Sequence, residues 1–360
     1  MPSSARDKNV VVGRQAVQSL SDLSPGPASV DSVDSATVLP VNGADTEALG
    51  HDGSQLSLPA TESSSSSSDG WQEGVVIAAP WLLLDDVIPQ APLQIGRTLL
   101  PEVVHPTYLS DSRVRYLARA LPSFVRSLAY TGATPFLHQN LWKSHQPESY
   151  QDCVSLSALY LCKTSANNAL ITNAINFKIA KLIASSRTWS LTEHLAAVQT
   201  LIVYQVMRLF DPSLNEQAQA QKHNLLLDAW AASLWKRSFI EPVVLATCYD
   251  TWVFNESLRR TVMMAIFVRC AWSCYTRGGL ASQIGVLATI PFTKDAKAWT
   301  VQPEEWDSRV LPELLERDSL TVYTDFTDVW TSETEMDTLD SFGKLLLAAS
   351  RGDDDPRLLG

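Results

Sequence analysis

The segment SLTEHLAAVQTLIVYQVMRLF, residues 190–210, constrains the fold more than any other part of the sequence. Ser190 followed by Glu193 is a capping box, in which each side chain satisfies a backbone donor of the first helical turn. Apolar residues then recur at spacings of three and four, the period of one helix face: Leu191, Leu195, Val198, Ile202, Val206 and Leu209. Asp211–Pro212 ends the run, because a residue before proline disfavours the helical conformation. The segment predicts a long helix with one buried stripe.

The same helical period recurs along the chain. It predicts helices over residues 111–130, 148–163, 167–185, 215–237, 241–277 and 335–349. We expect the helix over 241–277 to begin at Pro242, to break within itself and to stop at Gly278–Gly279. Residues 291–309 mix proline, tryptophan and charged residues and predict a packed loop. No alternating strand pattern lasts long enough to indicate a sheet, so we predict an all-α, single multi-helix domain.

The two ends of the chain differ from its middle in composition. Residues 1–70 contain no Phe, Trp or Tyr and include a run of six serines, Ser63–Ser68. A segment with so little apolar surface cannot offset the entropy cost of ordering its backbone. We therefore predict a disordered Ser-rich tail over residues 1–70, a helical domain over 71–350 and a frayed tail over 351–360.

Charge and cysteine content exclude several classes of protein. A formal net charge of −11 argues against direct binding to nucleic acid through a basic surface. Five cysteines, an odd number, do not suggest a secreted disulfide framework, and they favour a reducing intracellular compartment. The longest uncharged apolar run, residues 75–84, is short and interrupted by Pro80, so we expect a soluble protein without a membrane segment.

The motifs that would identify an enzyme are missing from the sequence. It has no G-x-G-x-x-G, no G-x-x-x-x-G-K-[ST] and no H-E-x-x-H. Asp85–Asp86 and Asp353–Asp355 lack the further carboxylate that a magnesium–diphosphate site on a helix would need. Cys270 and Cys274 lie one helical turn apart without a nearby histidine, and we interpret them as small buried side chains rather than metal ligands. We therefore expect no catalytic residue, no cofactor and no metal site.

An acidic segment late in the chain has two interpretations. Residues 325–340 combine six acids with Phe326 and Trp330, the composition of an acidic-hydrophobic activation segment. The favoured interpretation is a solvated face and loop that lead into the last helix, SFGKLLLAAS.

The stretch WVFNESLRRT, residues 252–261, places charged residues inside an apolar region. On a helix, Glu256 lies three residues before Arg259 and four before Arg260, the favoured order for ion pairs. The apolar run that follows indicates a central helix, so at least one arginine would be partly buried and would need acceptors. We favour a structural network, with a ligand or partner contact as the alternative.

This stretch also resembles a known family. WVFNESLRRTVMMAIFV is similar to the W-x-x-x-E-S-x-R-R-T helix in the regulatory (middle homology) domain of fungal zinc binuclear cluster transcription factors. TPFLHQNLW, ALYLCKTSANNALI, EHLAAVQTLIVYQVMRLFD and FGKLLLAASRG resemble other parts of that domain, in the same order, in regulators of specialised-metabolism gene clusters. The resemblance covers residues 75–352. The residues that match the helix pattern are Trp252, Glu256, Ser257, Arg259, Arg260 and Thr261, and the family assigns a catalytic role to none of them.

The resemblance implies a function and one departure from the family. The zinc cluster of these factors needs six cysteines with paired C-x-x-C spacings. This chain has no C-x-x-C and no cysteine before Cys153, so we expect it to lack that module. A misplaced start codon, a naturally shortened regulator and a degraded copy all stay open as explanations.

The resemblance therefore predicts a nuclear or nucleocytoplasmic transcription regulator of a fungal secondary-metabolite gene cluster. Such a chain would reach DNA only indirectly, through another transcription regulator or a DNA-binding partner chain, and could respond to a small-molecule effector. Two alternatives stay open: a small-molecule-sensing or corepressor-like binding protein, with a pocket that could include Arg259 or Arg260, and a helical enzyme of unknown type.

Overall fold

The computed structural model describes residues 76–78, 107–281, 284–309 and 320–360, all of which belong to a compact unit over residues 69–360. The disordered tail predicted for residues 1–70 lies outside the described residues. So does the N-terminal boundary of the predicted domain.

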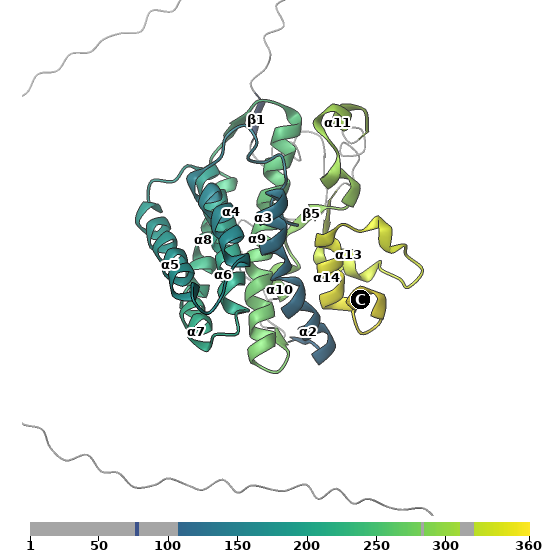
Figure 1. The fold of residues 1–360 in the computed structure, drawn as a ribbon. Coiled ribbons are helices and arrows are strands. Elements are labelled where there is room, and N and C mark those ends of the chain that lie inside the picture. Colours follow the sequence, from purple (N-terminus) through teal and green to yellow (C-terminus); the bar gives the residue numbers. More distant parts are fainter. Residues whose placement is uncertain (1–75, 79–106, 282–283, 310–319) are drawn as a thin grey trace, which may run out of the picture. The chain divides into compact units, whose positions relative to one another are not determined.

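The described part of the chain is predominantly helical, which confirms the predicted all-α class (Figure 1). Its α-helices are α2 (Asp111–Ala120), α3 (Ser123–Thr131), α4 (Glu148–Leu161), α5 (Asn168–Ser185), α6 (Leu191–Leu209), α7 (Leu214–Lys222), α8 (Asn224–Ser238), α9 (Cys248–Thr276), α10 (Ile284–Leu287), α11 (Pro303–Arg309), α13 (Tyr323–Asp328) and α14 (Ser341–Arg351). Its 3₁₀-helices are η1 (Ala296–Thr300), η2 (Met336–Thr338) and η3 (Pro356–Leu359). None of the described helices combines the length and apolar character needed to span a bilayer.

Short strands join distant parts of the chain in antiparallel pairs. They are β1 (Val76–Ala78), β2 (Thr107–Tyr108), β3 (Val243–Leu245), β4 (Leu280–Ala281), β5 (Pro291–Thr293) and β6 (Leu320–Val322), paired as β1–β3, β2–β4 and β5–β6. Each strand has only two or three residues, so no alternating pattern could reveal it in the sequence.

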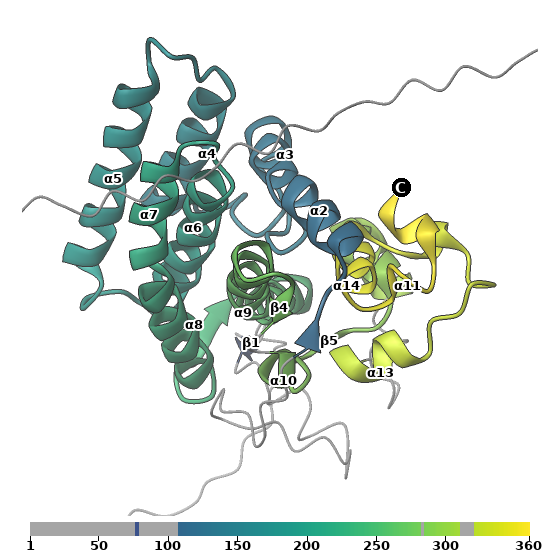
Figure 2. The same ribbon diagram turned by 90° about the horizontal axis from the view of Figure 1, so that it is seen from below.

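Helix α9 is the centre of the fold. Every residue from Thr251 to Val268 is buried, including the charged ones. Helices α6 and α8 pack on one side of α9, while α2, α10 and the strands β4 and β5 contact it elsewhere (Figure 2). A helix that is surrounded in this way must satisfy its polar side chains internally, because water cannot reach them.

Helix α6 is the second buried element. The predicted capping box is present: the Glu193 N–H donates to Ser190 Oγ over 3.3 Å, and the Ser190 N–H donates to Glu193 Oε2 over 2.8 Å. From His194 to Leu209 every residue is buried, so the predicted single stripe was too narrow. The reason is that α4, α7, α8 and α9 all pack against α6.

Four predicted helices have different boundaries in the structure. The predicted helix 335–349 begins only at Ser341, as α14, after the 3₁₀-helix η2. The predicted helix 111–130 is divided at Leu121–Pro122 into α2 and α3, and the predicted helix 215–237 is divided at His223 into α7 and α8. The predicted helix 241–277 begins only at Cys248 and then runs to Thr276 without an internal break. Pro242 does not start it, because the following residues pair with β1 as strand β3.

The end of α9 was predicted correctly, whereas the segment 291–309 was not. Gly278 and Gly279 end the helix with positive φ angles of 60° and 90°, a conformation that favours glycine. The segment 291–309, expected to be a packed loop, contains β5, η1 and α11.

The last residues, 351–360, are ordered rather than frayed. Leu358 is buried in a cluster with Leu347 and Ala348, and the Asp355 carboxylate accepts the indole N–H of Trp330 over 3.2 Å. The predicted fraying is therefore wrong here, because apolar residues of this segment find a place against α14. Trp330 packs against the same cluster, which supports the interpretation of residues 325–340 as a segment that leads into α14.

Candidate functional site

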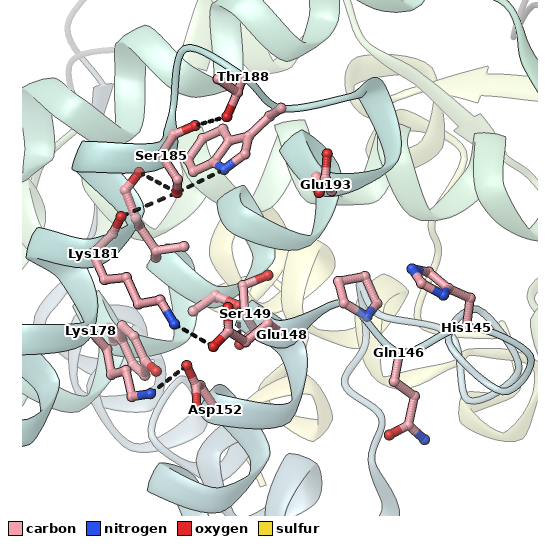
Figure 3. Close-up of a pocket in the computed structure, with 15 residues that line it drawn as sticks. His145, Gln146, Glu148, Ser149, Asp152, Lys178, Lys181, Ser185, Thr188 and Glu193 are labelled. Carbon is pink, nitrogen blue, oxygen red and sulfur yellow. Dashed lines mark hydrogen bonds and ion pairs between the residues drawn. The ribbon is translucent and has the colours of Figure 1, made fainter.

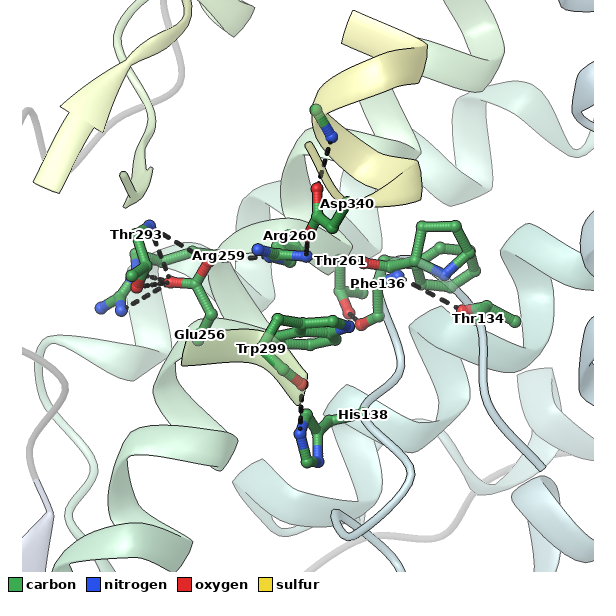
Figure 4. Close-up of polar contacts among 12 residues, drawn as sticks. Thr134, Phe136, His138, Glu256, Arg259, Arg260, Thr261, Thr293, Trp299 and Asp340 are labelled. Carbon is green, nitrogen blue, oxygen red and sulfur yellow. Dashed lines mark hydrogen bonds and ion pairs between the residues drawn. The ribbon is translucent and has the colours of Figure 1, made fainter. Parts of the chain in front are cut away.

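The charged residues of the stretch 252–261 meet in the core along α9 (Figure 4). The Glu256 side chain is fully buried, and its Oε2 accepts from Arg259 Nη2 at 2.8 Å and Nε at 3.1 Å. Its Oε1 accepts from Arg260 Nε at 2.8 Å. Both ion pairs are the ones that helical spacing predicts. Not one but both arginines are buried, with exposed fractions of 4% and 1%.

Segments far away in the sequence complete this network. The backbone N–H of Thr293, in β5, lies 3.1 Å from both carboxylate oxygens of Glu256, and the Thr293 hydroxyl donates to Oε2 over 2.8 Å. Arg260 Nη1 donates to Asp340 Oδ2 over 2.6 Å and to the Pro135 carbonyl over 3.2 Å. Glu256 and Arg260 therefore hold α9, β5, the start of α14 and the segment after α3 together.

The guanidinium of Arg260 is also held between two aromatic rings. Its central carbon lies 4.0 Å from the ring centre of Trp299 and 4.7 Å from that of Phe342. A planar guanidinium can stack on aromatic faces while its edge donates hydrogen bonds, which a lysine ammonium could not match. This position requires arginine.

The electrostatics of the network keep Glu256 and Arg260 ionised. Burial alone would raise the pKa of Glu256, but the charges of Arg259 and Arg260 outweigh it and lower that pKa to about 2. Burial likewise disfavours the charged form of Arg260, yet the carboxylates of Asp340 and Glu256 raise its pKa overall. Two cations thus face two anions, which is how buried charges are tolerated.

The other three residues of the family pattern are buried as well. Thr261 Oγ1 accepts from Gln199 Nε2 over 3.1 Å. Trp252 packs in an aromatic group with Trp306 and Trp299, and the Ser257 hydroxyl is buried without a partner in the described part of the chain. All six residues of the pattern are at most 7% exposed. Their geometry supports the structural interpretation, since none of them presents a surface to a partner.

Sequence reasoning missed the distant members of this network. Asp340 carries one readable signal, because its Oδ1 caps α14 by accepting the Gly343 N–H over 2.7 Å. Its second role, as the acceptor for Arg260, has no local signal. Thr293 and Trp299 were placed in a loop, and no pattern connected them to α9.

His138 lies next to this network. Its Nδ1 accepts the Asn140 N–H over 3.1 Å, and its Nε2 lies 2.9 Å from the Trp299 carbonyl, which can only accept. These two bonds define a neutral ring with the proton on Nε2. Burial is the main cause that lowers the pKa of His138 to about 4. The hydrogen bond to the Trp299 carbonyl opposes this shift, and the charge of Arg260 adds to it.

A pocket of about 360 Å³ lies among α4, α5 and α6 (Figure 3). Figure 3 shows Lys181 and Lys178 reaching from α5 toward Glu148 and Asp152 on α4. Lys178 Nζ lies 2.7 Å from Asp152 Oδ2, and Lys181 forms an ion pair with Glu148. Glu193, also in the lining, is held by the capping box. Both lysines are therefore paired with the acids that line the pocket beside them.

Tyr204 also lines this pocket. It is fully buried, and its hydroxyl has no hydrogen-bond partner among the described residues. Burial raises the pKa of Tyr204, so the side chain remains a neutral phenol. The neighbouring Thr200 hydroxyl is already used, since it donates to the Ser149 carbonyl over 3.0 Å. Tyr204 is the polar group of this pocket that a ligand could satisfy.

The unpartnered hydroxyl gives a test of the structure. We expect Tyr204→Phe to leave the free energy of unfolding unchanged or to raise it by about 1 kcal/mol, because a buried polar group without a partner destabilises the folded state. The matched variant Tyr160→Phe should lower it by about 1–2 kcal/mol, since that hydroxyl donates to the Met207 carbonyl and to Asp211. Urea denaturation of both variants measures the two changes in unfolding free energy. A larger loss for Tyr204→Phe than for Tyr160→Phe would contradict the absence of a hydrogen-bond partner for the Tyr204 hydroxyl.

The described residues include no group of three or more His, Cys, Asp or Glu that could hold a metal ion. Cys270 and Cys274 are both buried, in line with their interpretation as small apolar side chains. Burial raises the pKa of Cys274 to about 12, so its thiol stays protonated. The two cysteines line a small apolar cavity of about 30 Å³, room for little more than one water molecule.

Comparison with known proteins shows a similarity to a fungal transcription factor. The chain is 27% identical over 262 residues to the transcription factor gsfR2 of Penicillium aethiopicum, an alignment that covers 68% of this chain. The chain spans 60% of the length of that relative. No protein-family model matches the chain, and no solved structure matches it. The chain is thus similar to a fungal transcription factor over most of its length.

Proposed function

We propose that this protein regulates transcription, in the nucleus or between nucleus and cytoplasm, and that it controls a fungal secondary-metabolite gene cluster. The observation that carries this proposal is the similarity to the transcription factor gsfR2. The resemblance of residues 252–261 to the regulatory-domain helix supports it, and the target genes rest on that resemblance alone. The protein acts as a regulator and not as an enzyme.

The mode of action in this proposal is indirect. The chain carries a net charge of −11 and has no C-x-x-C spacing. An acidic surface repels the phosphate backbone, so DNA contacts come from a partner chain with its own DNA-binding module. Another transcription regulator is the expected partner.

Deleting the encoding gene tests the regulatory role. We expect the transcripts of one biosynthetic gene cluster to change at least several-fold and those of housekeeping genes to stay constant. Re-expression of the wild-type chain should restore them, and re-expression of Glu241→Gln, a change in a partly exposed ion pair, should restore them equally. Unchanged transcripts of every biosynthetic cluster under inducing conditions would contradict the proposed function.

DNA binding by the purified chain tests the indirect mode. At physiological salt we expect no sequence-specific complex with the promoters of the affected genes, because the phosphates would meet an acidic protein. Fluorescence anisotropy with labelled promoter fragments measures this. A nanomolar complex with one fragment would overturn the indirect mode and leave the regulatory role intact.

The pocket lined by Tyr204 favours a second candidate function, the sensing of a small molecule. Its volume of about 360 Å³ is within the range of ligand sites, and its buried hydroxyl lacks a partner in the described part of the chain. An effector bound there would contact α4, α5 and α6. Thermal stabilisation by a product of the regulated cluster, lost in Tyr204→Phe, would support this function.

A further inference from the structure

A second pocket, of about 320 Å³, lies at the C-terminal end of α9 beside the junction of α7 and α8. Its lining contains two arginines, Arg269 and Arg277, and none of the described residues that line it is acidic. In a chain with 39 acidic and 28 basic residues, a pocket lined by cations without carboxylates is unusual. The pocket therefore carries a local positive potential on an otherwise acidic protein.

The two arginines differ in how far they are neutralised. Arg269 forms an ion pair with Asp228, a residue that is not part of the pocket lining. Arg277 is exposed and forms no ion pair within the described part of the chain. The carbonyl groups at the end of α9 carry partial negative charge and oppose an anion there, but the full positive charge of Arg277 outweighs them. Arg277 is thus the cation most available to a ligand.

Two further donors in the lining have no partner. The indole of Trp272 is only 5% exposed, yet its Nε1–H donates to nothing in the described part of the chain. The hydroxyl of Ser273, the next residue, is buried and unpartnered as well. A buried donor without an acceptor destabilises the folded state, so such groups in a pocket point to an acceptor that arrives with a ligand.

The amide of Asn224 is oriented by a chain of hydrogen bonds. The Arg208 guanidinium can only donate, and its Nη2 donates to Gln205 Oε1 over 2.5 Å. Gln205 Nε2 must then be the donor toward Asn224 Oδ1, at 2.7 Å. The NH₂ group of Asn224 therefore has no acceptor among the described residues, and Asn224 lines the pocket. Arg208 and Gln205 act here as positioning residues.

We propose that this pocket binds a small organic carboxylate. Its oxygens would accept hydrogen bonds from Arg277, Trp272 and Asn224, which supply donors and no competing acceptor charge. An apolar body would lie on Leu225, a lining residue that is 77% exposed. The volume accommodates a single-ring acid. This site is separate from the one lined by Tyr204 and does not depend on the role in transcription.

A titration with benzoate, and with benzamide as its uncharged match, tests the site. In a ¹H–¹⁵N spectrum of the indole groups, Trp272→Phe identifies the resonance of Trp272 among the 11 tryptophans. We expect benzoate to shift this resonance in a saturable way at millimolar concentration, and benzamide to leave it in place. Trp272→Phe serves only this assignment, because it also removes part of a buried ring that packs against Phe210 and lowers stability for that reason.

Variants that remove one positive charge complete the test. Arg277→Gln should weaken benzoate binding at least tenfold without affecting folding, because Arg277 is exposed and unpaired in the described residues. Arg187→Gln removes the same charge from an exposed position outside the pocket and should leave the affinity unchanged. An equal shift with benzamide, or an unchanged affinity in Arg277→Gln, overturns the proposal.

Discussion

Replacement of Glu256 by alanine or glutamine will lower the free energy of unfolding by about 3 kcal/mol or more. The carboxylate is fully buried and accepts hydrogen bonds from Arg259, Arg260 and Thr293. Without it, Arg259 loses the carboxylate that it pairs with, and Arg260 keeps only the carboxylate of Asp340. Glutamine keeps one acceptor oxygen, but its NH₂ group would point at the N–H and O–H donors that the second carboxylate oxygen now accepts from. Chemical denaturation at pH 7 measures the loss.

Arg237 and Glu241 supply a matched control on the same protein. They are also four residues apart and form a two-pronged pair with both distances 2.7 Å, but the Glu241 side chain is 41% exposed. Exposed pairs contribute about 0–1 kcal/mol, so Glu241→Gln should cost no more than that. Equal losses for the two glutamine variants would mean that burial of Glu256 does not set its contribution.

The partners of Glu256 also show what could be predicted from the sequence. Arg259 and Arg260 lie on the same helix as Glu256, and helical spacing alone brings them together. The contact of Glu256 with Thr293, and those of Arg260 with Asp340 and Pro135, join residues 37, 80 and 125 positions apart. Such pairings depend on how the elements pack, and no local pattern encodes them.

The helix boundaries failed for a related reason. Pro242 is a good first residue for a helix, and the apolar residues after it fit the helical period. In the structure these residues instead pair with Val76–Ala78, more than 160 positions earlier. A tertiary partner overrode the local preference, whereas Gly278–Gly279 ended the helix as predicted because their φ angles are a local property.

The interior of the candidate pockets was not predictable at all. Lys178, Asp152 and Tyr204 come from three different helices, and each fits its own helix without any sign of the others. Only the packing of α4, α5 and α6 turns them into one site. The same holds for Trp272 and Asn224, which come from α9 and α8.

Acidification from pH 7 to pH 5 will destabilise the protein by about 4 kcal/mol, mainly through two histidines. His138 is 1% exposed and His194 is 3% exposed, and both have a pKa lowered to about 4. For His194, burial is the first cause and Arg237 the second, since Arg237 Nη1 lies 3.0 Å from Nδ1 and can only donate. Both rings are therefore neutral when the protein is folded.

The direction of the effect follows from proton binding. In the unfolded chain both histidines have a pKa near 6.5, so between pH 6.5 and pH 4 the unfolded state binds more protons than the folded state. The stabilisation is complete above pH 6.5 and is lost as the pH falls toward 4, by about 2 kcal/mol for each histidine at pH 5. His223, whose pKa is lowered by burial and by Arg208, acts in the same direction.

The carboxylates act in a different pH range, which allows the two contributions to be separated. The pKa of Glu256 is lowered to about 2, so its stabilisation is complete above pH 4.5 and is lost only below that value. Between pH 7 and pH 5 the change in stability thus belongs to the histidines. We therefore expect the free energy of unfolding to fall between pH 7 and pH 5 even in a variant that lacks Glu256.

Urea denaturation at pH 7, 6 and 5 measures this dependence, and substitutions assign it. His194→Gln should lower stability at pH 7 but reduce the change between pH 7 and pH 5 by about half, because the altered side chain no longer titrates. His145→Gln, at an exposed position, should change neither quantity. An equal free energy of unfolding at pH 7 and pH 5 in the wild-type chain would contradict the lowered pKa values of His138 and His194 in the folded state.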